Sequence, residues 1–172
     1  MDEDGYTGGT AAHGAELFVD AGLNANRVTT DLEPGIPITK SSLQVGPHVG
    51  FGARRAVSDK NDLGVRVEWD HVDGHSLFGV RALDYRHRYT DSFAAGLFAG
   101  VARYSVDTPA YSIYYGVGGQ WMDVLPQWDL GVDLRHAQNV ARDHVLPGDP
   151  PGSRPETFYK IDSALLYLSR RF

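Results

Sequence analysis

The chain contains no cysteine among its 172 residues. This excludes disulfide scaffolds, thiol catalysis and thiolate metal sites. It also has no run of 18 apolar residues, which excludes a transmembrane helix. Acidic residues outnumber basic residues, and the net charge of -6 argues against nucleic acid as a partner. Strands that cross a membrane are not excluded. Barrel strands alternate apolar with polar residues, so an averaged hydropathy does not detect them.

Small and aromatic residues are plentiful, with 20 Gly, 9 Tyr and 7 Phe, which is typical of a β-rich chain with crowded positions. The length predicts one domain. Residues 1–11 are rich in Gly and acid, and we expect a flexible N-terminal segment there, followed by a barrel over residues 12–172. Met1 directly precedes an acidic stretch, as if placed on a mature sequence, so we expect that a secretory leader was removed.

Apolar and polar residues alternate from His13 for more than ten positions, which exceeds the usual five or six residues of soluble strands. The same pattern recurs along the chain. It changes parity within the fourth segment, and we expect a β-bulge near Arg81. The sequence therefore predicts an all-β fold of eight antiparallel strands, at about 13–25, 43–54, 63–70, 76–89, 93–104, 111–121, 128–135 and 157–172.

The predicted connections differ in length. Two segments rich in Pro and Gly, Asn24–Ser41 and Asn139–Glu156, are expected to be long loops, whereas the turns after the second, fourth and sixth strands are short. Outer-membrane barrels place short turns on the periplasmic side and long loops outside. An even number of strands then leaves both termini periplasmic.

Eight up-and-down strands fit two folds, a soluble lipocalin-like barrel and a transmembrane barrel. Two features favour the membrane. Charged residues share their face with glycine, as in Gly64-x-Arg66-x-Glu68, which suits a cramped interior better than a solvated exterior. The opposite face is aliphatic in its middle and has aromatic residues near the strand ends, as in the girdles of membrane barrels. These predicted girdle residues are Trp69, Tyr85, Phe93, Tyr111, Trp121 and Trp128.

The predicted inward face carries ionisable side chains of both signs. We expect them to form a salt-bridge network that fills the lumen, since an eight-stranded interior is just wide enough for side chains. An acid/base pair or an ion path is the alternative. The predicted lumen charge network comprises Glu16, Asp20, Arg66, Glu68, Asp70, Asp84, Arg86, Asp129, Asp133 and Arg135.

The last residues form an apolar strand that stops at an aromatic carboxy terminus. Ala164, Leu166, Leu168 and Phe172 share one parity, and Arg170 interrupts it. This ending, the alternation and the loop asymmetry resemble the small eight-stranded outer-membrane barrels of the OmpA-barrel, OmpX and opacity-protein type. The resemblance covers residues 13–172. It implies a monomeric transmembrane β-barrel in a Gram-negative outer membrane, with Phe172 as part of the signal read by the outer-membrane assembly machinery.

Motifs for catalysis are sparse. The chain has no Gly-x-Ser-x-Gly, and no histidine is followed two places later by Ser, as in the lipid A deacylase barrels. His71 and His75 flank a predicted turn, which is a weak metal signal. We therefore expect no enzyme, cofactor or metal, but a structural or surface-interaction protein in contact with lipid and lipopolysaccharide. Expected contacts to lipopolysaccharide phosphates are Arg27, Lys40, Arg142 and Arg154. A narrow channel for small solutes and a lipid A-modifying enzyme are the alternatives.

Overall fold

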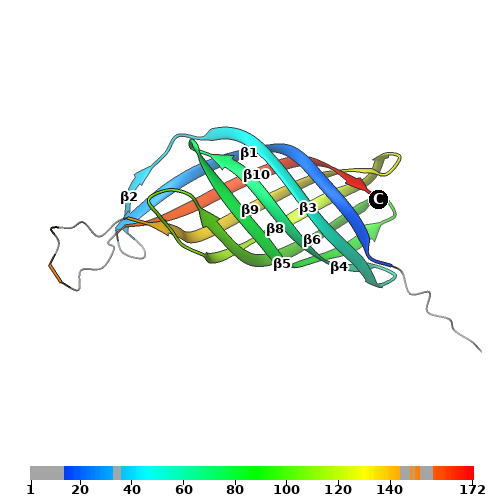
Figure 1. Cartoon of the computed structure of the whole chain (residues 1–172). Coiled ribbons are helices and arrows are strands. Elements are labelled where there is room, and N and C mark those ends of the chain that lie inside the picture. Colours follow the sequence, from blue (N-terminus) through cyan, green and yellow to red (C-terminus); the bar gives the residue numbers. More distant parts are fainter. Residues whose placement is uncertain (1–13, 33–35, 144–147, 149, 152–156) are drawn as a thin grey trace, which may run out of the picture.

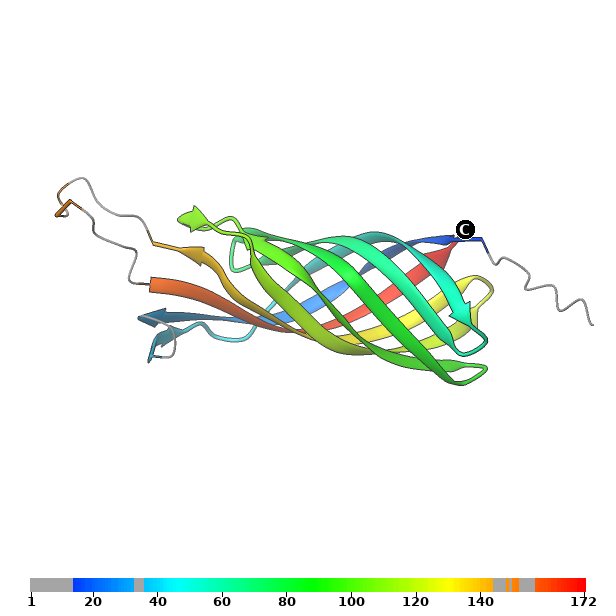
Figure 2. The ribbon, with the colours of Figure 1, turned by 90° about the horizontal axis from the view of Figure 1, so that it is seen from below.

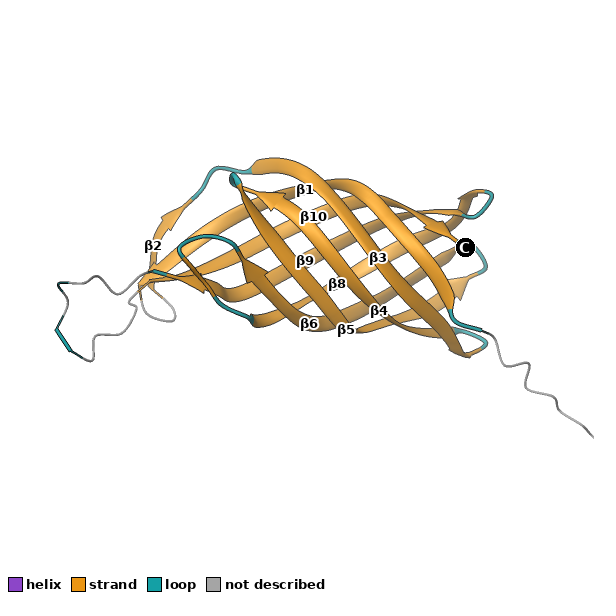
Figure 3. Ribbon diagram, in the orientation of Figure 1, coloured by secondary structure: helices purple, strands orange, loops and turns teal. Residues whose placement is uncertain are grey.

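The computed structural model describes residues 14–32, 36–143, 148, 150–151 and 157–172, almost all of them in strands (Figure 3). Among these residues no helix is long and apolar enough to cross a membrane. The strands are β1 (Glu16–Leu32), β2 (Ile36–Lys40), β3 (Gln44–Ser58), β4 (Asn61–Val72), β5 (His75–Thr90), β6 (Phe93–Tyr104), β7 (Thr108–Pro109), β8 (Ser112–Leu125), β9 (Trp128–Arg142) and β10 (Thr157–Arg171).

Eight long strands form a closed antiparallel barrel. Their order is β10-β1-β3-β4-β5-β6-β8-β9, and pairing between β10 and β9 closes the ring. The strands tilt steeply around the barrel axis, as the two perpendicular views show (Figures 1 and 2). Closure leaves no free edge among the long strands. The predicted eight-stranded up-and-down barrel is confirmed, and β2 and β7 are short additions to it.

The prediction of a loop over Asn24–Ser41 was wrong for most of its length. β1 continues to Leu32 and pairs with β10 as far as Thr157, and β2 then folds back onto β1. The Asn, Arg and Thr residues of this stretch suggest a loop by composition. They are nevertheless in a strand, because pairing with β10 satisfies their backbone groups.

The second predicted loop, Asn139–Glu156, also begins later than expected. β9 continues to Arg142, and the pairing of β9 with β10 is interrupted between Tyr159 and Ile161. Asn139 lies at this irregularity with a positive φ of 53°. Most of residues 144–156 lie outside the described part of the chain. The β4–β5 connection is tight, since Asp73 and Gly74 both have positive φ, as a two-residue hairpin turn with the twist of its strands requires.

The predicted bulge near Arg81 is confirmed. The pairing of β5 shifts between Arg81 and Leu83, and the pairing of β4 shifts between Gly64 and Arg66. Ala82 and Leu83 are both exposed, so the two halves of β5 present opposite sequence parities to the interior. As a result, Arg81 and Asp84 are both buried.

The barrel buries charge and exposes apolar side chains, the reverse of a soluble protein. Arg66 and Glu68 on β4 are buried, while their neighbours Val65 and Val67 are 53% and 55% exposed. The same contrast holds on every long strand, so a continuous apolar wall surrounds the molecule. Soluble monomers rarely expose an apolar patch of more than a few hundred Å². A lipid environment removes this penalty, and the fold is that of a transmembrane β-barrel.

Glycine on the inward face makes room for large side chains. A Cβ atom on Gly131 would lie 2.1 Å from the Tyr167 ring, and one on Gly52 would lie 2.4 Å from the Phe18 ring. Gly116 stands in the same relation to Phe98, at 2.5 Å. The aromatic rings therefore lie directly over glycines of neighbouring strands. This explains why glycine alternates with charged residues on the inward face of so small a barrel.

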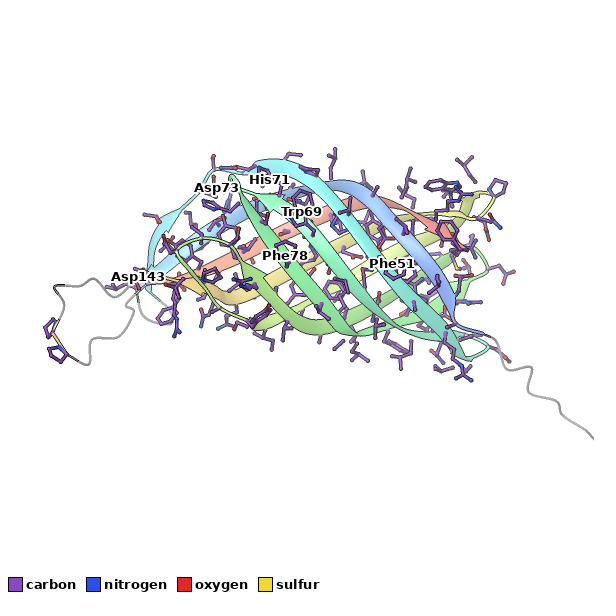
Figure 4. The ribbon with its side chains drawn as sticks, in the orientation of Figure 1. Phe51, Trp69, His71, Asp73, Phe78 and Asp143 are labelled. Carbon is purple, nitrogen blue, oxygen red and sulfur yellow. The ribbon has the colours of Figure 1, made fainter. Side chains whose placement is uncertain are left out.

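The two ends of the barrel differ. One end, which we call the short-turn end, carries the carboxy terminus and the turns at Asp59–Lys60, Asp91–Ser92 and Pro126–Gln127 (Figure 1). The opposite end, the loop end, carries β2, β7 and the extensions of β1, β9 and β10. Trp69, His71 and Asp73 follow one another along β4 and its turn toward the loop end (Figure 4).

Candidate functional site

The centre of the lumen is a charge cluster around Glu68. Arg81 donates two hydrogen bonds to this carboxylate, with Nε–Oε1 at 2.7 Å and Nη2–Oε2 at 3.0 Å. The Tyr114 hydroxyl donates to Oε1 at 2.6 Å, and Arg135 lies 3.4 Å from Oε2. All four side chains are buried and come from four strands, β4, β5, β8 and β9. The cluster therefore ties opposite walls of the barrel together.

Asp133 and Asp84 connect this centre to further arginines. Asp133 lies 2.7 Å from Arg81 and 3.8 Å from Arg66. Asp84 lies 3.3 Å from Arg86 and 3.6 Å from Arg66. Five carboxylates face five guanidinium groups in this region, which gives charge balance. They are Asp20, Glu68, Asp70, Asp84 and Asp133 against Arg54, Arg66, Arg81, Arg86 and Arg135.

Most of the predicted lumen residues lie where the sequence placed them. All members of the predicted network are buried except Glu16, whose side chain is 43% exposed. Glu16 begins β1 at the rim of the barrel, on the same parity as buried Asp20, and lies 3.8 Å from Arg171, which also contacts Asp129 at 3.3 Å. Asp129 lies near the same end, where Gln120 donates a hydrogen bond to it.

The sequence did not identify Arg81, which makes the shortest arginine–carboxylate contacts of the network, at 2.7 Å to both Glu68 and Asp133. By simple alternation, Arg81 would lie on the same face as the outward-pointing residues in the second half of β5. The bulge shifts this alternation, so that Arg81 points inward. Tyr114 and Tyr167 were also missed as network members. Tyr167 accepts hydrogen bonds from Arg86 at 2.9 Å and Arg66 at 3.4 Å. The sequence signal for Arg81 is a charged residue at the point where the alternation of apolar and polar residues changes parity.

A second buried group, His48, lies beside the network. Its Nδ1 is 2.8 Å from Asp70, which also contacts Arg135 at 3.0 Å and Asn24 at 3.1 Å. His48 thus has a carboxylate partner, the arrangement that orients a general base. Both residues are enclosed within the barrel, however, and among the described residues no serine or threonine hydroxyl forms a hydrogen bond to the ring. The pair has the geometry of a structural contact.

An apolar layer closes the lumen between the charges and the loop end. Val72, Leu77 and Tyr104 are at most 2% exposed, and the Tyr104 hydroxyl donates to the Val72 carbonyl at 3.1 Å. The layer comprises Val28, Val72, Leu77, Ala102, Tyr104, Ala137, Val140, Ala141 and Ile161, and it packs on Phe98 and Tyr114, whose rings and hydroxyl contact the charge cluster. The lumen is therefore filled twice along its length, once by ion pairs and once by packed apolar groups.

The predicted girdle residues lie at both ends of the apolar wall. Phe93 and Trp121 are cross-strand partners near the short-turn end, with ring centroids 5.2 Å apart. Tyr85 and Trp128 lie near the same end, and Tyr85 donates a hydrogen bond to Asn61. Trp69 and Tyr111 lie toward the loop end.

Outward-facing charges lie beyond the apolar wall at each end. Arg55 and Arg170 are exposed near the short-turn end, and Arg170 contacts the rings of Trp128 and Phe172. Toward the loop end, Asp162 lies opposite Arg27 and 2.7 Å from His136. Charge on the lipid-facing surface is costly at the bilayer midplane and cheap near the interfaces. These side chains therefore mark the two edges of the hydrocarbon layer.

The mouth at the loop end is polar. The Tyr159 hydroxyl donates a hydrogen bond to Asp107, and Lys160 pairs with Asp31. Tyr159 lies beyond the outward charges of β10, outside the membrane-spanning part. Partial burial and this hydrogen bond raise the pKa of Tyr159 to about 12. Of the cations expected at lipopolysaccharide, Arg27, Lys40 and Arg142 are exposed here, while Arg154 lies outside the described residues.

The apolar residues that share one parity in the last strand face outward. Ala164, Leu166, Leu168 and Phe172 are exposed, whereas Tyr167 and Ser169 are buried. The Phe172 amide donates to the Leu17 carbonyl at 2.9 Å, which fixes the carboxy terminus to β1. Arg170 keeps the outward phase and reaches toward the membrane edge.

No protein-family model and no curated protein sequence matches the chain. Solved structures do resemble it. The attachment invasion locus protein Ail of Yersinia pestis is 15% identical, with a TM-score of 0.54 over 91% of this chain and 98% of that chain. Neisserial surface protein A is 15% identical, with a TM-score of 0.57 over 92% of this chain and 99% of that chain.

A de novo designed transmembrane β-barrel is 13% identical, with a TM-score of 0.51 over 91% of this chain and 95% of that chain. These likenesses establish the fold that the chain shares with small outer-membrane barrels.

Proposed function

We propose that this chain is a non-catalytic integral protein of a bacterial outer membrane, whose closed barrel holds the loop end as a surface for interactions outside the cell. The single observation that carries the proposal is the doubly filled lumen. A barrel closed by the Glu68 cluster and by the layer around Tyr104 has no use as an open pore. Its remaining accessible surface outside the lipid lies at its two ends.

The loop end is the better candidate for interaction. It carries the extensions of β1, β9 and β10 and the short strands β2 and β7, whereas the other end has only tight turns. Loops on a rigid scaffold commonly carry binding. The likeness to the attachment invasion locus protein supports such a role, since that protein's name states a surface function. In this orientation both termini are periplasmic, and lipid and lipopolysaccharide surround the wall.

Single cysteines test this orientation, because the chain has none of its own. Gly148 is exposed at the loop end with no atom near its Cβ position, and Asp91 is exposed in a short turn. In intact cells a membrane-impermeant maleimide should label the Gly148→Cys variant and leave the Asp91→Cys variant unlabelled. After permeabilisation both should react. The reverse pattern would exclude the proposed orientation, and recovery in the soluble fraction would exclude the membrane location.

A narrow channel is the second candidate, favoured by one observation. Several buried polar atoms of the lumen have no hydrogen-bond partner within the described protein, among them His48 Nε2, Arg81 Nη1 and Arg135 Nη2. Buried polar groups of this kind are usually satisfied by water. A hydrated lumen is the first requirement for conduction. The apolar layer at the loop end argues against a continuous water path.

A further inference from the structure

A pocket of about 230 Å³ opens at the mouth of the loop end, directly over the apolar layer. Val28 and Tyr104 belong to this layer and form the floor of the pocket. Val106 and Tyr159, which also line the pocket, pack against the same layer. Its remaining lining residues are Thr30, Thr39, Lys40, Ser41, Asp73 and His75. The pocket belongs neither to the charge network of the lumen nor to the apolar wall that faces lipid. Those two features therefore do not explain which residues line the pocket.

Two opposite sides of the barrel contribute to the pocket. On one side Tyr159, Thr30 and Thr39 are cross-strand neighbours along β10, β1 and β2. On the other side are His75 and Tyr104, on strands β5 and β6, which lie across the ring from β10 and β1. The pocket therefore spans the mouth of the barrel, and its shape is fixed by the barrel itself.

Three aromatic rings form a continuous row in the pocket. The His75 and Tyr104 rings meet edge to face, with centroids 5.7 Å apart and an interplanar angle of 72°. The Tyr104 and Tyr159 centroids are 6.3 Å apart. Tyr104 is almost fully buried at the centre of the row, while His75 is exposed and Tyr159 half-buried at its ends. This row offers ring faces and edges to an apolar surface of a ligand.

Hydroxyl and charged groups complete the lining. Thr30 and Thr39 supply hydroxyl groups from β1 and β2, whereas the Ser41 hydroxyl already accepts from the Val28 amide and donates to the Ser42 carbonyl. Lys40 supplies donors only, and Asp73 supplies acceptors, one of which receives a hydrogen bond from Gln44 at 2.6 Å. The pocket thus combines aromatic rings with both donors and acceptors and with charges of opposite sign. This combination does not select a purely apolar ligand or an ion of one sign.

We propose that this pocket binds one sugar ring of a surface glycan. A pyranose ring has an apolar C–H face, which suits the aromatic row, and a rim of hydroxyls that each donate and accept, which suits the Thr, Lys and Asp groups. The volume of about 230 Å³ lies below the roughly 300–1,000 Å³ of sites for drug-sized ligands, so the site fits a single ring. The ring belongs either to lipopolysaccharide of the same membrane or to a glycan from outside the cell.

The inference rests on the proposed outward orientation only for the source of the glycan. Binding is therefore measured on the purified full chain in lauryldimethylamine oxide, a detergent without a sugar headgroup. Saturation-transfer NMR with methyl α-D-glucopyranoside, methyl α-D-galactopyranoside and the methyl glycoside of N-acetylglucosamine should give transfer to ring C–H protons for at least one of them. Cyclohexanol, which has a ring but a single hydroxyl, should give little transfer.

Two variants and one control locate the binding. His75→Ala removes one end of the aromatic row, and Thr30→Val removes a hydroxyl without changing shape. Each should weaken sugar binding by about three- to tenfold, the effect of losing one neutral contact. His87→Ala is the matched control, since His87 also packs edge to face on a tyrosine but at the short-turn end. This control should bind as the unmodified protein does.

A lack of transfer from all three sugars would overturn the inference, as would equal transfer from cyclohexanol or unchanged binding by both pocket variants. Two further ligands separate the sources. They are the core oligosaccharide released from lipopolysaccharide by mild acid, and isomaltotriose as a glycan from solution. Binding of the first assigns the site to the protein's own membrane, and binding of the second alone assigns it to an external glycan. These results do not depend on the labelling in cells that tests orientation.

Discussion

Arg81 and Glu68 form a bidentate ion pair in the centre of the barrel, with both nitrogen–oxygen distances at or below 3.0 Å. Arg81 comes from the bulged strand β5 and Glu68 from its neighbour β4. The bulge brings the guanidinium group into the lumen, where it also contacts Asp133 and lies 3.6 Å over the Phe98 ring. A single irregularity of one strand thus completes the network that closes the lumen.

Removal of the central carboxylate should destabilise the barrel strongly. Glu68→Gln leaves Arg81 and Arg135 with one charged partner fewer each, at a depth where water cannot replace it fully. Breaking a buried pair in this way costs roughly 3–5 kcal/mol. Urea unfolding in detergent, followed by circular dichroism, measures the loss. Glu16→Gln at the exposed rim is the control and should change stability by about 0.5 kcal/mol or less. Equal effects of both variants would contradict a structural role for the network.

The unmodified protein should not conduct in a planar bilayer. Removing part of the charge network by Arg66→Ala/Glu68→Ala should still give no steady current, because the apolar layer around Tyr104 remains in place. Adding Tyr104→Ala should produce current steps, since both fillings of the lumen are then interrupted. Each variant must first show a folded barrel by circular dichroism. Steady ohmic conductance of the unmodified protein would instead favour the channel.

Deletion of Phe172 should slow insertion in cells and leave refolding into detergent intact. The deletion removes one backbone hydrogen bond to Leu17 and one exposed ring, a small part of the strand pairing. An assembly factor that reads the terminal aromatic would lose its signal, however. Pulse-chase analysis of membrane insertion measures the first effect, and refolding yield measures the second. Insertion of the truncated chain at the normal rate would refute the signal role.

Tyr159 should stay protonated at a pH where ordinary tyrosines ionise. Its pKa is raised to about 12 by partial burial and by the hydrogen bond to Asp107, from an unfolded value of about 10. Because the folded pKa is the higher one, the contact contributes its full stability below pH 10 and loses it as the pH rises from about 10 to 12. Ultraviolet difference titration against Tyr159→Phe should show the missing ionisation near pH 12, and a difference already complete at pH 10 would disprove the shift.

The sequence alone determined the barrel. Alternation with period two sets which residues face lipid, and glycine beside charge on the other face indicates a narrow interior, as the pairs of Gly131 with Tyr167 and Gly52 with Phe18 show. This works because each residue's side is decided locally by the strand pleat. Most inward charges, such as Asp20, Arg66 and Asp133, were identifiable for the same reason.

Tertiary structure decided what local parity cannot. The position of the bulge set the inward orientation of Arg81, and pairing with β10 converted the polar stretch after Asn24 from an expected loop into strand. The partners within the lumen and the pocket of Tyr159, Thr30 and His75 depend on which strands face each other across the closed ring. Closure of the barrel brings together residues that are far apart in the chain. The two-residue alternation predicts only which face of a strand a residue occupies, so it does not predict which strands lie opposite each other in the barrel.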